Sequence, residues 1–406
     1  MPLAVFTGGS PQAIHSCELR RYRWPRRYLK GERVDQVTRL GDYTLIFVGP
    51  ALGQTSVGDY TQNLIEAVRP HFGEVVEHRT PGPGNATLAD VRRHRSAVRA
   101  LVADGPPNRV LVHAELSTGA VAPFWSIAGL KDVPVTATVH DPPQGLWFVG
   151  RTKFVADHRL LNHAIHYPLR PLSRAIEGVA YRDKTLFALT DAGRRSIERT
   201  YPRTRALYVP CMAFDRPTIT PVQDRPKAVG FFGHVYRGKG FEQIAKIREL
   251  LPDDIAIRIA GRGTEALPAA DGIEVLGGVD GPEEDAFFAS IRAIIVPYGK
   301  RHWYAETYPA SGVGASAQSY STPVISTGYG ALEELDEHTG AVTVATTERD
   351  GGVATALAAE ITSLVNDGER LERLGRNAER TRHERSRAGT GKAYAEAWAR
   401  LLGVET

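Results

Sequence analysis

The sequence predicts an α/β protein made of two similar halves, each built on a largely parallel sheet. Two observations support this prediction. Short apolar segments of strand character alternate with helical patterns along the chain, and they fall into two sets on either side of a proline-rich break. The length of 406 residues also suits two domains better than one hydrophobic core. Two domains imply a cleft between them.

The strand-like segments alternate with helical patterns in both halves. The first set comprises residues 43–50, 74–78, 109–116, 133–140, 185–190 and 206–210. The second set comprises residues 228–233, 255–261, 273–279, 293–298, 323–327 and 341–346. Between the sets, residues 210–227 contain four prolines and no sustained periodicity, which indicates an interdomain linker.

The predicted domains are therefore residues 1–215 and residues 228–380, both Rossmann-like. A closing helical pattern runs from about Leu371 to Leu402, and we expect its part from about residue 385 to 406 to pack back onto the first domain. In open parallel sheets, ligands bind beyond the carboxyl ends of the strands. The loops after the predicted strands are therefore the places to look for chemistry.

Composition and charge exclude several classes of protein. The chain is 42% hydrophobic and 24% charged, which excludes wholesale disorder and a fibrous repeat. A net charge of +4 is too small for a dedicated nucleic-acid binder of this length. No run of 18 apolar residues and no secretory leader pattern occur, so we expect a cytoplasmic protein. Cys17 and Cys211 have no CxxC partners, so neither a disulfide framework nor a thiolate metal site is expected.

The positive charge gathers near the amino terminus, within residues 1–40, which we interpret as a basic extension. Residues 20–39 carry eight Lys and Arg side chains interleaved with aromatic residues. Two interpretations stay open. The segment is either a surface for anionic lipid at the inner membrane face or for an acidic partner, or a solvated extension packed on the first domain.

Two loops of the first half are candidate sites. Gly58 opens the helix after the first strand, where a glycine lets a ligand approach the backbone or simply makes the turn. His140 ends the fourth strand beside Asp141, a place suited to binding a substrate hydroxyl or to capping a loop. Trp147 and Phe148 follow as an apolar platform for an acceptor, or as packing anchors of a loop.

The second half opens with a stronger candidate. A buried strand ends in Gly233, and the next loop places Arg237 and Lys239 between glycines before a helix begins near Phe241. Two cations and helix N–H groups at a strand tip suit a diphosphate. A flexible basic turn is the alternative. Val279 follows another glycine turn and is a candidate surface for a nucleotide base, although ordinary turn chemistry explains that turn equally well.

Two segments carry a resemblance to a known family. GFFGHVYRGKGFEQI (230–244) and residues 305–335 resemble the retaining glycosyltransferases of family 4, which have the GT-B fold of two Rossmann-like domains facing across a cleft. The TVHD strand end, the FALTDAGRR segment and the PVIST ending support the resemblance. It extends from about Tyr43 through the carboxyl-terminal helix.

The resemblance implies roles for individual residues. Lys239 matches the family lysine that grips the donor diphosphate, and His140 matches the histidine that faces the donor sugar. Gly58 matches a glycine near the reacting groups. His234 stands where the family has an arginine, and Arg237 is a candidate to supply that guanidinium.

This chain departs from the family at the Glu-x7-Glu pair. Tyr308 and Ser316 occupy the two glutamate positions, and Glu306 lies two residues upstream of the first. The family uses these glutamates to hold the donor sugar and the ribose. Ser311, Gly312 and Val313 retain a turn whose N–H groups suit phosphate.

The resemblance implies a metal-independent enzyme that transfers a sugar from a nucleotide-diphosphate sugar, its co-substrate, to a hydroxyl with retention of configuration. No cofactor is expected. The second domain would bind the donor, and the first would bind a carbohydrate, lipid-linked or small-molecule acceptor. Two alternatives stay open: a GT-B protein that binds donor or acts as a scaffold without catalysis, and a GT-B epimerase that acts on the nucleotide sugar itself.

Overall fold

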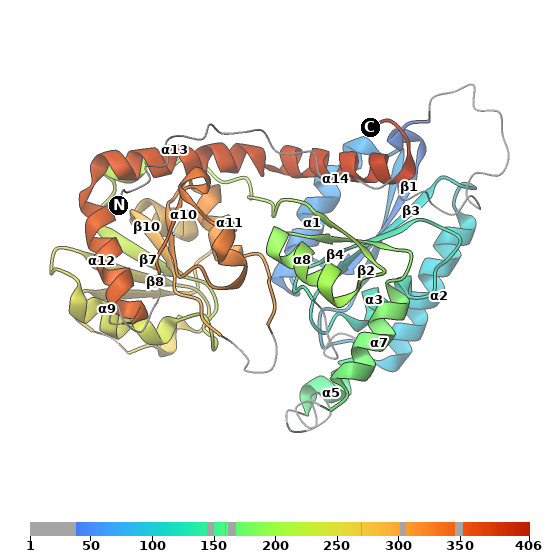
Figure 1. The fold of residues 1–406 in the computed structure, drawn as a ribbon, viewed down its shortest axis with the longest axis horizontal. Coiled ribbons are helices and arrows are strands. Elements are labelled where there is room, and N and C mark those ends of the chain that lie inside the picture. Colours follow the sequence, from blue (N-terminus) through green and yellow to red (C-terminus); the bar gives the residue numbers. More distant parts are fainter. Residues whose placement is uncertain are drawn as a thin grey trace, which may run out of the picture. The chain divides into compact units, whose positions relative to one another are not determined.

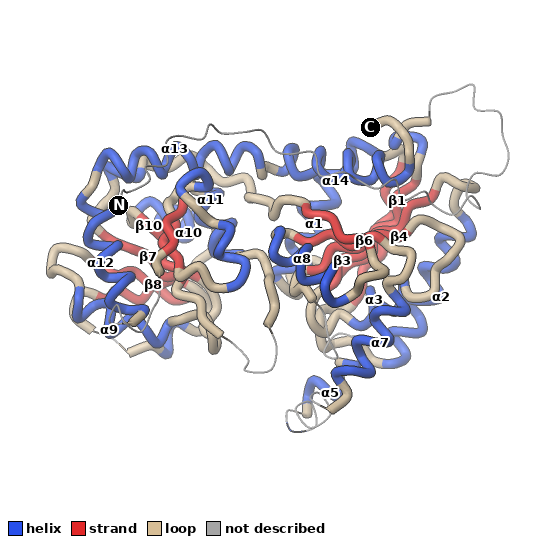
Figure 2. Tube along the Cα trace, in the orientation of Figure 1, coloured by secondary structure: helices blue, strands red, loops and turns tan. Residues whose placement is uncertain are grey.

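The computed structural model describes residues 38–143, 150–158, 160, 168–268, 270–300, 306–345 and 352–406. Within them lie two parallel six-stranded sheets, drawn with their helices in Figure 1 and as red strands in Figure 2. Both sheets belong to one compact unit, Thr38–Thr406. The α/β class with two parallel sheets is thus confirmed.

The first sheet has the strand order β2-β1-β3-β4-β5-β6. Every residue of β1, β3, β4 and β5 is buried, as expected for parallel strands that are covered by helices on both faces. Its strands are β1 (Thr44–Pro50), β2 (Glu74–Thr80), β3 (Val110–Leu116), β4 (Val135–Val139), β5 (Thr185–Ala188) and β6 (Arg205–Tyr208). Helices in this part of the chain are α1 (Ser56–Val68), α2 (Leu88–Asp104), α3 (Val121–Ile127), α5 (Lys153–Asp157), α7 (Arg170–Ala180) and α8 (Asp191–Thr200).

The second sheet has the order β12-β11-β10-β7-β8-β9. Its strands are β7 (Ala228–Phe232), β8 (Ala256–Ala260), β9 (Ile273–Gly277), β10 (Ala293–Val296), β11 (Val324–Ser326) and β12 (Ala341–Thr343). Helices in this part are α9 (Ile244–Leu250), α10 (Pro282–Ala289), α11 (Gly312–Ser319) and α12 (Val353–Asn366). Short 3-10 turns are η2 (Leu40–Asp42), η3 (Arg69–His71), η4 (Val222–Asp224), η5 (Phe241–Gln243), η6 (Thr264–Ala266), η7 (Gly330–Glu334) and η8 (Glu337–Thr339).

Each predicted strand segment overlaps one observed strand, with ends that differ by up to a few residues. Between the sheets, the predicted linker contains only the turn η4. It is anchored by Arg225, which is buried and donates hydrogen bonds to the carbonyl oxygens of Thr220 (2.7 Å) and Tyr320 (3.2 Å) and to the Thr322 hydroxyl (2.8 Å). These bonds attach the linker to the second half, because a buried guanidinium needs acceptors for its N–H groups.

The closing helical pattern forms two helices, α13 (Gly368–Glu384) and α14 (Arg387–Leu402). Arg385 and Ser386 separate them, and Ser386 caps α14 by accepting a hydrogen bond from the N–H of Gly389 (3.2 Å). Helix α13 contacts α11 and α12, whereas α14 contacts α1. The indole N–H of Trp398 donates to Thr136 of β4 (3.0 Å), so α14 is part of the core of the first half.

The strand orders locate the two places where a ligand is expected. Order along the first sheet reverses between β1 and β3, and along the second between β7 and β10. Crevices at such switch points, outside the carboxyl ends of the strands, are the usual ligand sites of open parallel sheets. The residues that follow β1, β3, β7 and β10 are therefore the ones to examine.

A buried carboxyl group of α7 gives the stability of the fold a predictable pH dependence. Glu177 is fully buried and accepts a hydrogen bond from the Tyr201 hydroxyl, and burial raises the pKa of its carboxyl to about 8. The folded state therefore holds this proton more tightly than the unfolded chain, whose ordinary value is 4.5. Its contribution to stability is complete below that value and is lost as the pH rises toward about 8.

We therefore expect Glu177→Gln to reduce the loss of stability at alkaline pH. Melting temperatures of the wild type and the variant, measured at pH 5 and pH 8, test this. The wild type should lose more of its melting temperature between the two values than the variant does. Equal losses in both proteins would contradict the buried, proton-holding state of Glu177.

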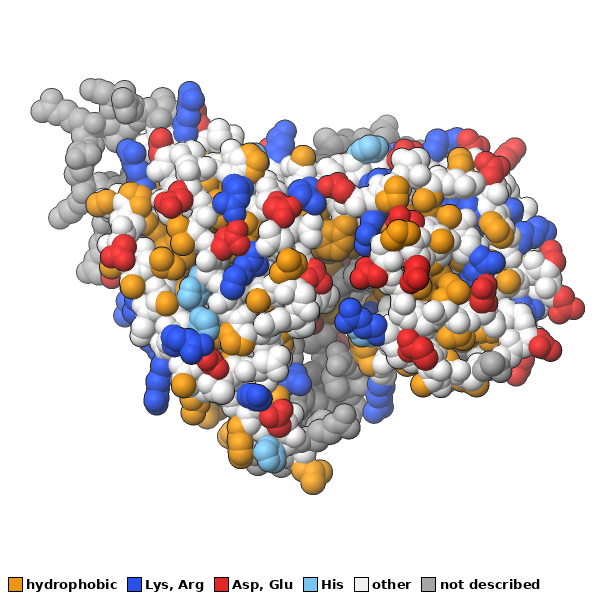
Figure 3. All heavy atoms as spheres, turned by 180° about the vertical axis from the view of Figure 1, so that it is seen from behind, with side chains coloured by type: hydrophobic (Ala, Val, Ile, Leu, Met, Phe, Trp, Pro, Cys, Tyr) orange, Lys and Arg blue, Asp and Glu red, His pale blue; other side chains and the backbone are white. Residues whose placement is uncertain are grey.

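The surface of the described residues carries charges of both signs. On the face shown in Figure 3, Lys and Arg side chains are interspersed with Asp and Glu. Among the described helices, none combines the length and the hydropathy of a membrane-spanning segment. Nearly all of the basic segment 20–39, with the rest of residues 1–37, lies outside the described residues.

Candidate functional site

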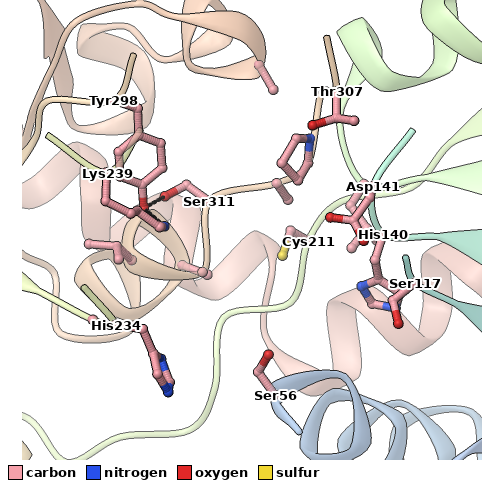
Figure 4. Close-up of a pocket in the computed structure, with 18 of the residues that line it drawn as sticks. Ser56, Ser117, His140, Asp141, Cys211, His234, Lys239, Tyr298, Thr307 and Ser311 are labelled. Atoms are coloured by element: carbon pink, nitrogen blue, oxygen red, sulfur yellow. Dashed lines mark hydrogen bonds between the residues drawn. The ribbon is translucent and has the colours of Figure 1, made fainter. Parts of the chain in front are cut away.

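A cavity of about 630 Å³ opens at the carboxyl ends of both sheets. Its lining includes Ser117 after β3, Gly233 and His234 after β7, and Tyr298 after β10. Figure 4 shows Lys239, Tyr298 and Ser311 together on one wall, with His140, Asp141 and Ser117 on the other. The cavity thus lies at the switch points of both sheets.

The loop after β7 holds Lys239 in a fixed place. Gly240 has φ 78°, and a Cβ there would lie 2.1 Å from the carbonyl oxygen of Pro297, so only glycine permits this close approach. The ammonium group of Lys239 donates to the Tyr298 hydroxyl and lies 3.9 Å from the centre of the Tyr298 ring. Burial raises the pKa of Tyr298, so the phenol stays protonated beside the cation. The ammonium is therefore held at the cavity wall by an aromatic ring and a hydroxyl.

Arg237 and His234 lie on the same wall with exposed side chains. Ser311, Gly312, Val313 and Ser316 complete it at the amino-terminal end of α11. The Ser311 hydroxyl accepts a hydrogen bond from the N–H of Gly314 (3.1 Å). The first N–H groups of α11 have no carbonyl partner within the helix. Side-chain cations and a helix amino terminus together make this wall attractive to an anion.

The opposite wall presents His140, whose side chain is 12% exposed. Its Nε2 lies 2.5 Å from Oε2 of Glu115, and the other oxygen of Glu115 lies 2.9 Å from Nε2 of His113. Glu115 and His113 are both fully buried on β3. The Tyr60 and His140 rings pack in a T-shaped arrangement with centroids 5.1 Å apart. One buried carboxylate thus serves two imidazoles, and one of these faces the cavity.

The Glu115 carboxyl is ionised over the whole physiological pH range. Burial alone raises its pKa, but the hydrogen bonds that His113 and His140 donate to it, together with the favourable electrostatics of both imidazoles, outweigh burial and lower the pKa to about 2. A buried carboxylate is stable only with such partners. Loss of either histidine would therefore leave the buried Glu115 carboxylate with one hydrogen-bond partner fewer.

Polar groups at the starts of loops and helices also lie at this wall. Asp141 accepts a hydrogen bond from the backbone N–H of Thr118 (2.9 Å), and Thr55 caps α1 by accepting from the N–H of Gly58 (3.2 Å). A Cβ on Gly58 would lie 2.3 Å from the carbonyl oxygen of Ala51. Gly58 therefore lets the loop after β1 pack closely on α1, and it does not itself line the cavity.

The two halves are joined by hydrogen bonds beside the cavity. The N–H of Tyr308 donates to the carbonyl of Pro142 (2.7 Å), and the Thr190 hydroxyl donates to the carbonyl of Tyr308 (3.0 Å). Glu334, from η7, accepts from the N–H groups of Asp191 (3.0 Å) and Ala192 at the start of α8. These bonds hold the cavity walls together in this conformation.

Some predicted residues lie away from the cavity lining. The Tyr308 hydroxyl donates to Glu306 (3.1 Å), and both residues lie next to cavity residues Thr307 and Pro309 without lining the cavity. Val279 packs against the core cluster that includes Phe287 and Phe288. The predicted acceptor residues, Trp147 and Phe148, lie outside the described residues.

Sequence reasoning missed Glu115, His113 and Tyr298. Cys211 also lines the cavity, and burial raises the pKa of its thiol to about 11. The signal for the first two was present: His113 and Glu115 stand two apart in an otherwise apolar strand, so they share one face. Among the described residues, no group of three or more His, Cys, Asp and Glu side chains is placed to hold a metal ion.

Solved structures with the same arrangement of sheets share very little sequence with this chain. HepE from Anabaena, in complex with UDP and glucose, has 12% identity and a TM-score of 0.57, with 88% of this chain and 100% of that chain covered. The chain has the GT-B fold. The catalytic domain of starch synthase IV from Arabidopsis thaliana, bound to ADP and acarbose, has 12% identity and a TM-score of 0.57, with 89% and 100% covered.

A third GT-B neighbour is AviGT4, a glycosyltransferase involved in avilamycin A biosynthesis. It has 15% identity and a TM-score of 0.53, with 89% of this chain and 98% of that chain covered. No protein-family model matches the sequence, and no curated protein matches it significantly. The similarity therefore establishes the GT-B fold, and the function must be argued from the site.

Proposed function

We propose that this GT-B protein is a retaining, metal-independent glycosyltransferase that moves a sugar from a nucleotide-diphosphate donor to an acceptor hydroxyl. One observation supports this most: a single cavity carries the fixed cation of Lys239 on one wall and His140 on the other. In this proposal residues 228–380 bind the donor and residues 1–215 bind the acceptor. Neighbours with this fold were solved with UDP and with ADP, which agrees with a nucleotide ligand.

The proposal gives each wall its own task. Lys239, Arg237 and the amino-terminal end of α11 would hold the donor diphosphate, since all three present positive charge or N–H donors. His140 would contact the sugar, because it faces this wall across the cavity. Ser316 and the turn at Ser311 would stand near the nucleoside, where the related family uses glutamates.

The reaction exchanges one bond at the anomeric carbon for another. The bond from that carbon to the diphosphate oxygen breaks, and the acceptor oxygen forms its bond on the same face of the sugar. The acceptor proton passes to the departing diphosphate, so no protein nucleophile takes part. Lys239 and Arg237 would stabilise the charge that grows on the leaving group, which is the task a divalent cation performs in other enzymes.

Transfer is accordingly expected to continue at an unchanged rate in excess EDTA. The measurement compares nucleoside diphosphate release with and without the chelator, on enzyme purified without added metal. Full loss of activity that Mg²⁺ restores would contradict the metal-independent part of the proposal and leave the transfer itself standing.

A panel of UDP-, GDP-, ADP- and TDP-sugars tests the transferase proposal. A true donor should raise the melting temperature, because ligand bound only to the folded state stabilises it by mass action. With an acceptor present it should also release nucleoside diphosphate. Binding without release would favour a scaffold, and a changed sugar without an acceptor would favour an epimerase. Among the described lining residues, Asp141 bears the only carboxylate, which disfavours the epimerase.

A further inference from the structure

The buried carboxylate behind His140 has no place in the roles given so far. Its Oε2 is 2.5 Å from Nε2 of His140, and no solvent reaches the Glu115 side chain. An apolar side chain at this position could be buried without a desolvation penalty, whereas a buried carboxylate needs several hydrogen-bond partners. His113 and His140 are these partners, and a buried charge kept at such a site suggests a function.

The proton positions in this network follow from its outermost members. Trp398 has only an N–H to offer, so Thr136 accepts from it (3.0 Å) and keeps its own hydroxyl proton to donate. The neighbouring acceptor is Nδ1 of His113, 2.8 Å away. His113 then carries its proton on Nε2, which faces Oε1 of Glu115 at 2.9 Å.

The second oxygen of Glu115 faces His140 in the same way. An ionised carboxylate only accepts hydrogen bonds, so Nε2 of His140 must carry a proton. In the neutral ring this leaves the lone pair on Nδ1. Because the directions of the two ring nitrogens diverge, the one not bonded to the buried Glu115 is available to the cavity that His140 lines. Within the described part of the chain, Nδ1 has no protein hydrogen-bond partner.

We infer that Glu115 is a positioning residue that fixes the His140 tautomer, so that Nδ1 is presented to the cavity as a hydrogen-bond acceptor for a donor-sugar hydroxyl. The role as acceptor rests on the function proposed above, whereas the tautomer rests on the geometry alone. The carboxylate also places negative charge behind the ring, which favours positive charge that develops at the anomeric carbon in the transition state.

The other ionisable groups around His140 do not compete with Glu115 for this role. Tyr60 of α1 and Tyr394 of α14 are buried, and burial raises the pKa values of both, as it does for Cys211. These three are therefore neutral at neutral pH. Asp141, next in the chain, accepts from the N–H of Thr118, and His113 lies on the far side of Glu115. Glu115 is the charged group in hydrogen-bond contact with the ring.

The tautomer is read directly on the wild-type protein. Nitrogen-15 NMR of labelled histidines, with His140 assigned by comparison with His140→Gln, distinguishes protonation at Nε2 from protonation at Nδ1. We expect the Nε2–H form. Protonation of the neutral ring at Nδ1 would overturn the inference, whether or not the protein transfers sugar.

The second arm uses Glu115→Gln, which keeps the shape and removes the charge. We expect kcat to fall by about tenfold or more with little change in donor KM. Glu177→Gln is the matched control, since it replaces another fully buried glutamate of the same half and should keep both kcat and donor KM.

A purely structural Glu115 would give a lower melting temperature with kcat per folded molecule unchanged, which would overturn the inference. If Glu115→Gln does not fold, the wild-type spectrum still decides. The expected tautomer without any sugar transfer would refute the proposed function while the positioning of His140 stands. Sugar transfer with the Nδ1-protonated tautomer would refute the positioning of His140 while the proposed function stands.

Discussion

Replacing Lys239 by methionine is expected to weaken nucleotide-sugar binding by about 1.5 to 3 kcal/mol, or roughly 10- to 150-fold in Kd. The reason is the loss of a charge-assisted contact to the diphosphate. The ammonium group is already held by Tyr298, so little entropy is lost when the ligand binds. Methionine keeps an aliphatic stem that can pack on the same ring. Isothermal titration with the donor and with the free nucleoside diphosphate measures the effect.

The matched control for Lys239 is Lys246→Met. Lys246 is an exposed lysine of α9, it does not line the cavity, and its replacement changes the net charge equally. It should leave donor affinity unchanged. If Lys239→Met binds the donor as tightly as the wild type, with a normal melting temperature, the diphosphate site is wrongly placed.

Replacing His140 by alanine should lower kcat/KM by at least about tenfold, equivalent to about 1.4 kcal/mol of transition-state stabilisation. Nucleotide affinity should barely change, because His140 lies on the wall opposite the cations. The loss is expected to be mainly in kcat, since the interaction strengthens as charge develops on the sugar. Removal of the imidazole also leaves Glu115 with one partner fewer, so the melting temperature must be measured on the same preparation.

His338→Ala serves as the control, because His338 is exposed on η8 and does not line the cavity. It should retain full activity and stability. A purely structural His140 would give a less stable variant with kcat/KM per folded molecule intact. A His140→Ala protein with normal stability and full activity would contradict both the catalytic and the structural role.

The strands and the main site loops could be predicted from the sequence because both depend on the local pattern of apolar residues and turn residues. Parallel strands covered on both faces are continuous apolar runs, which is why β1, β3 and β7 were recognised. Their carboxyl ends then indicate the loops to examine, and these loops carry His140 and Lys239, which both line the cavity. The rule that ligands bind beyond the carboxyl ends of parallel strands therefore indicated the site more clearly than any single motif.

The partners of these two residues could not be predicted, because they depend on packing between segments far apart in the chain. Glu115 stands 25 residues before His140, and Tyr298 stands 59 residues after Lys239. The contacts of Tyr308 could not be predicted for the same reason. Its backbone joins the two halves through Pro142 and Thr190, a role that leaves no trace in the residue type.

The most direct test of the account is a single NMR-monitored reaction with the stabilising nucleotide sugar, an acceptor and excess EDTA. The account predicts that one nucleoside diphosphate is released for each glycoside formed, and that the new linkage keeps the anomeric configuration of the donor. Both products should diminish together in Lys239→Met and His140→Ala. An inverted linkage would contradict the retaining mechanism. Failure of every nucleotide sugar to release its nucleotide, despite tight binding, would contradict the claim that this cavity catalyses glycosyl transfer.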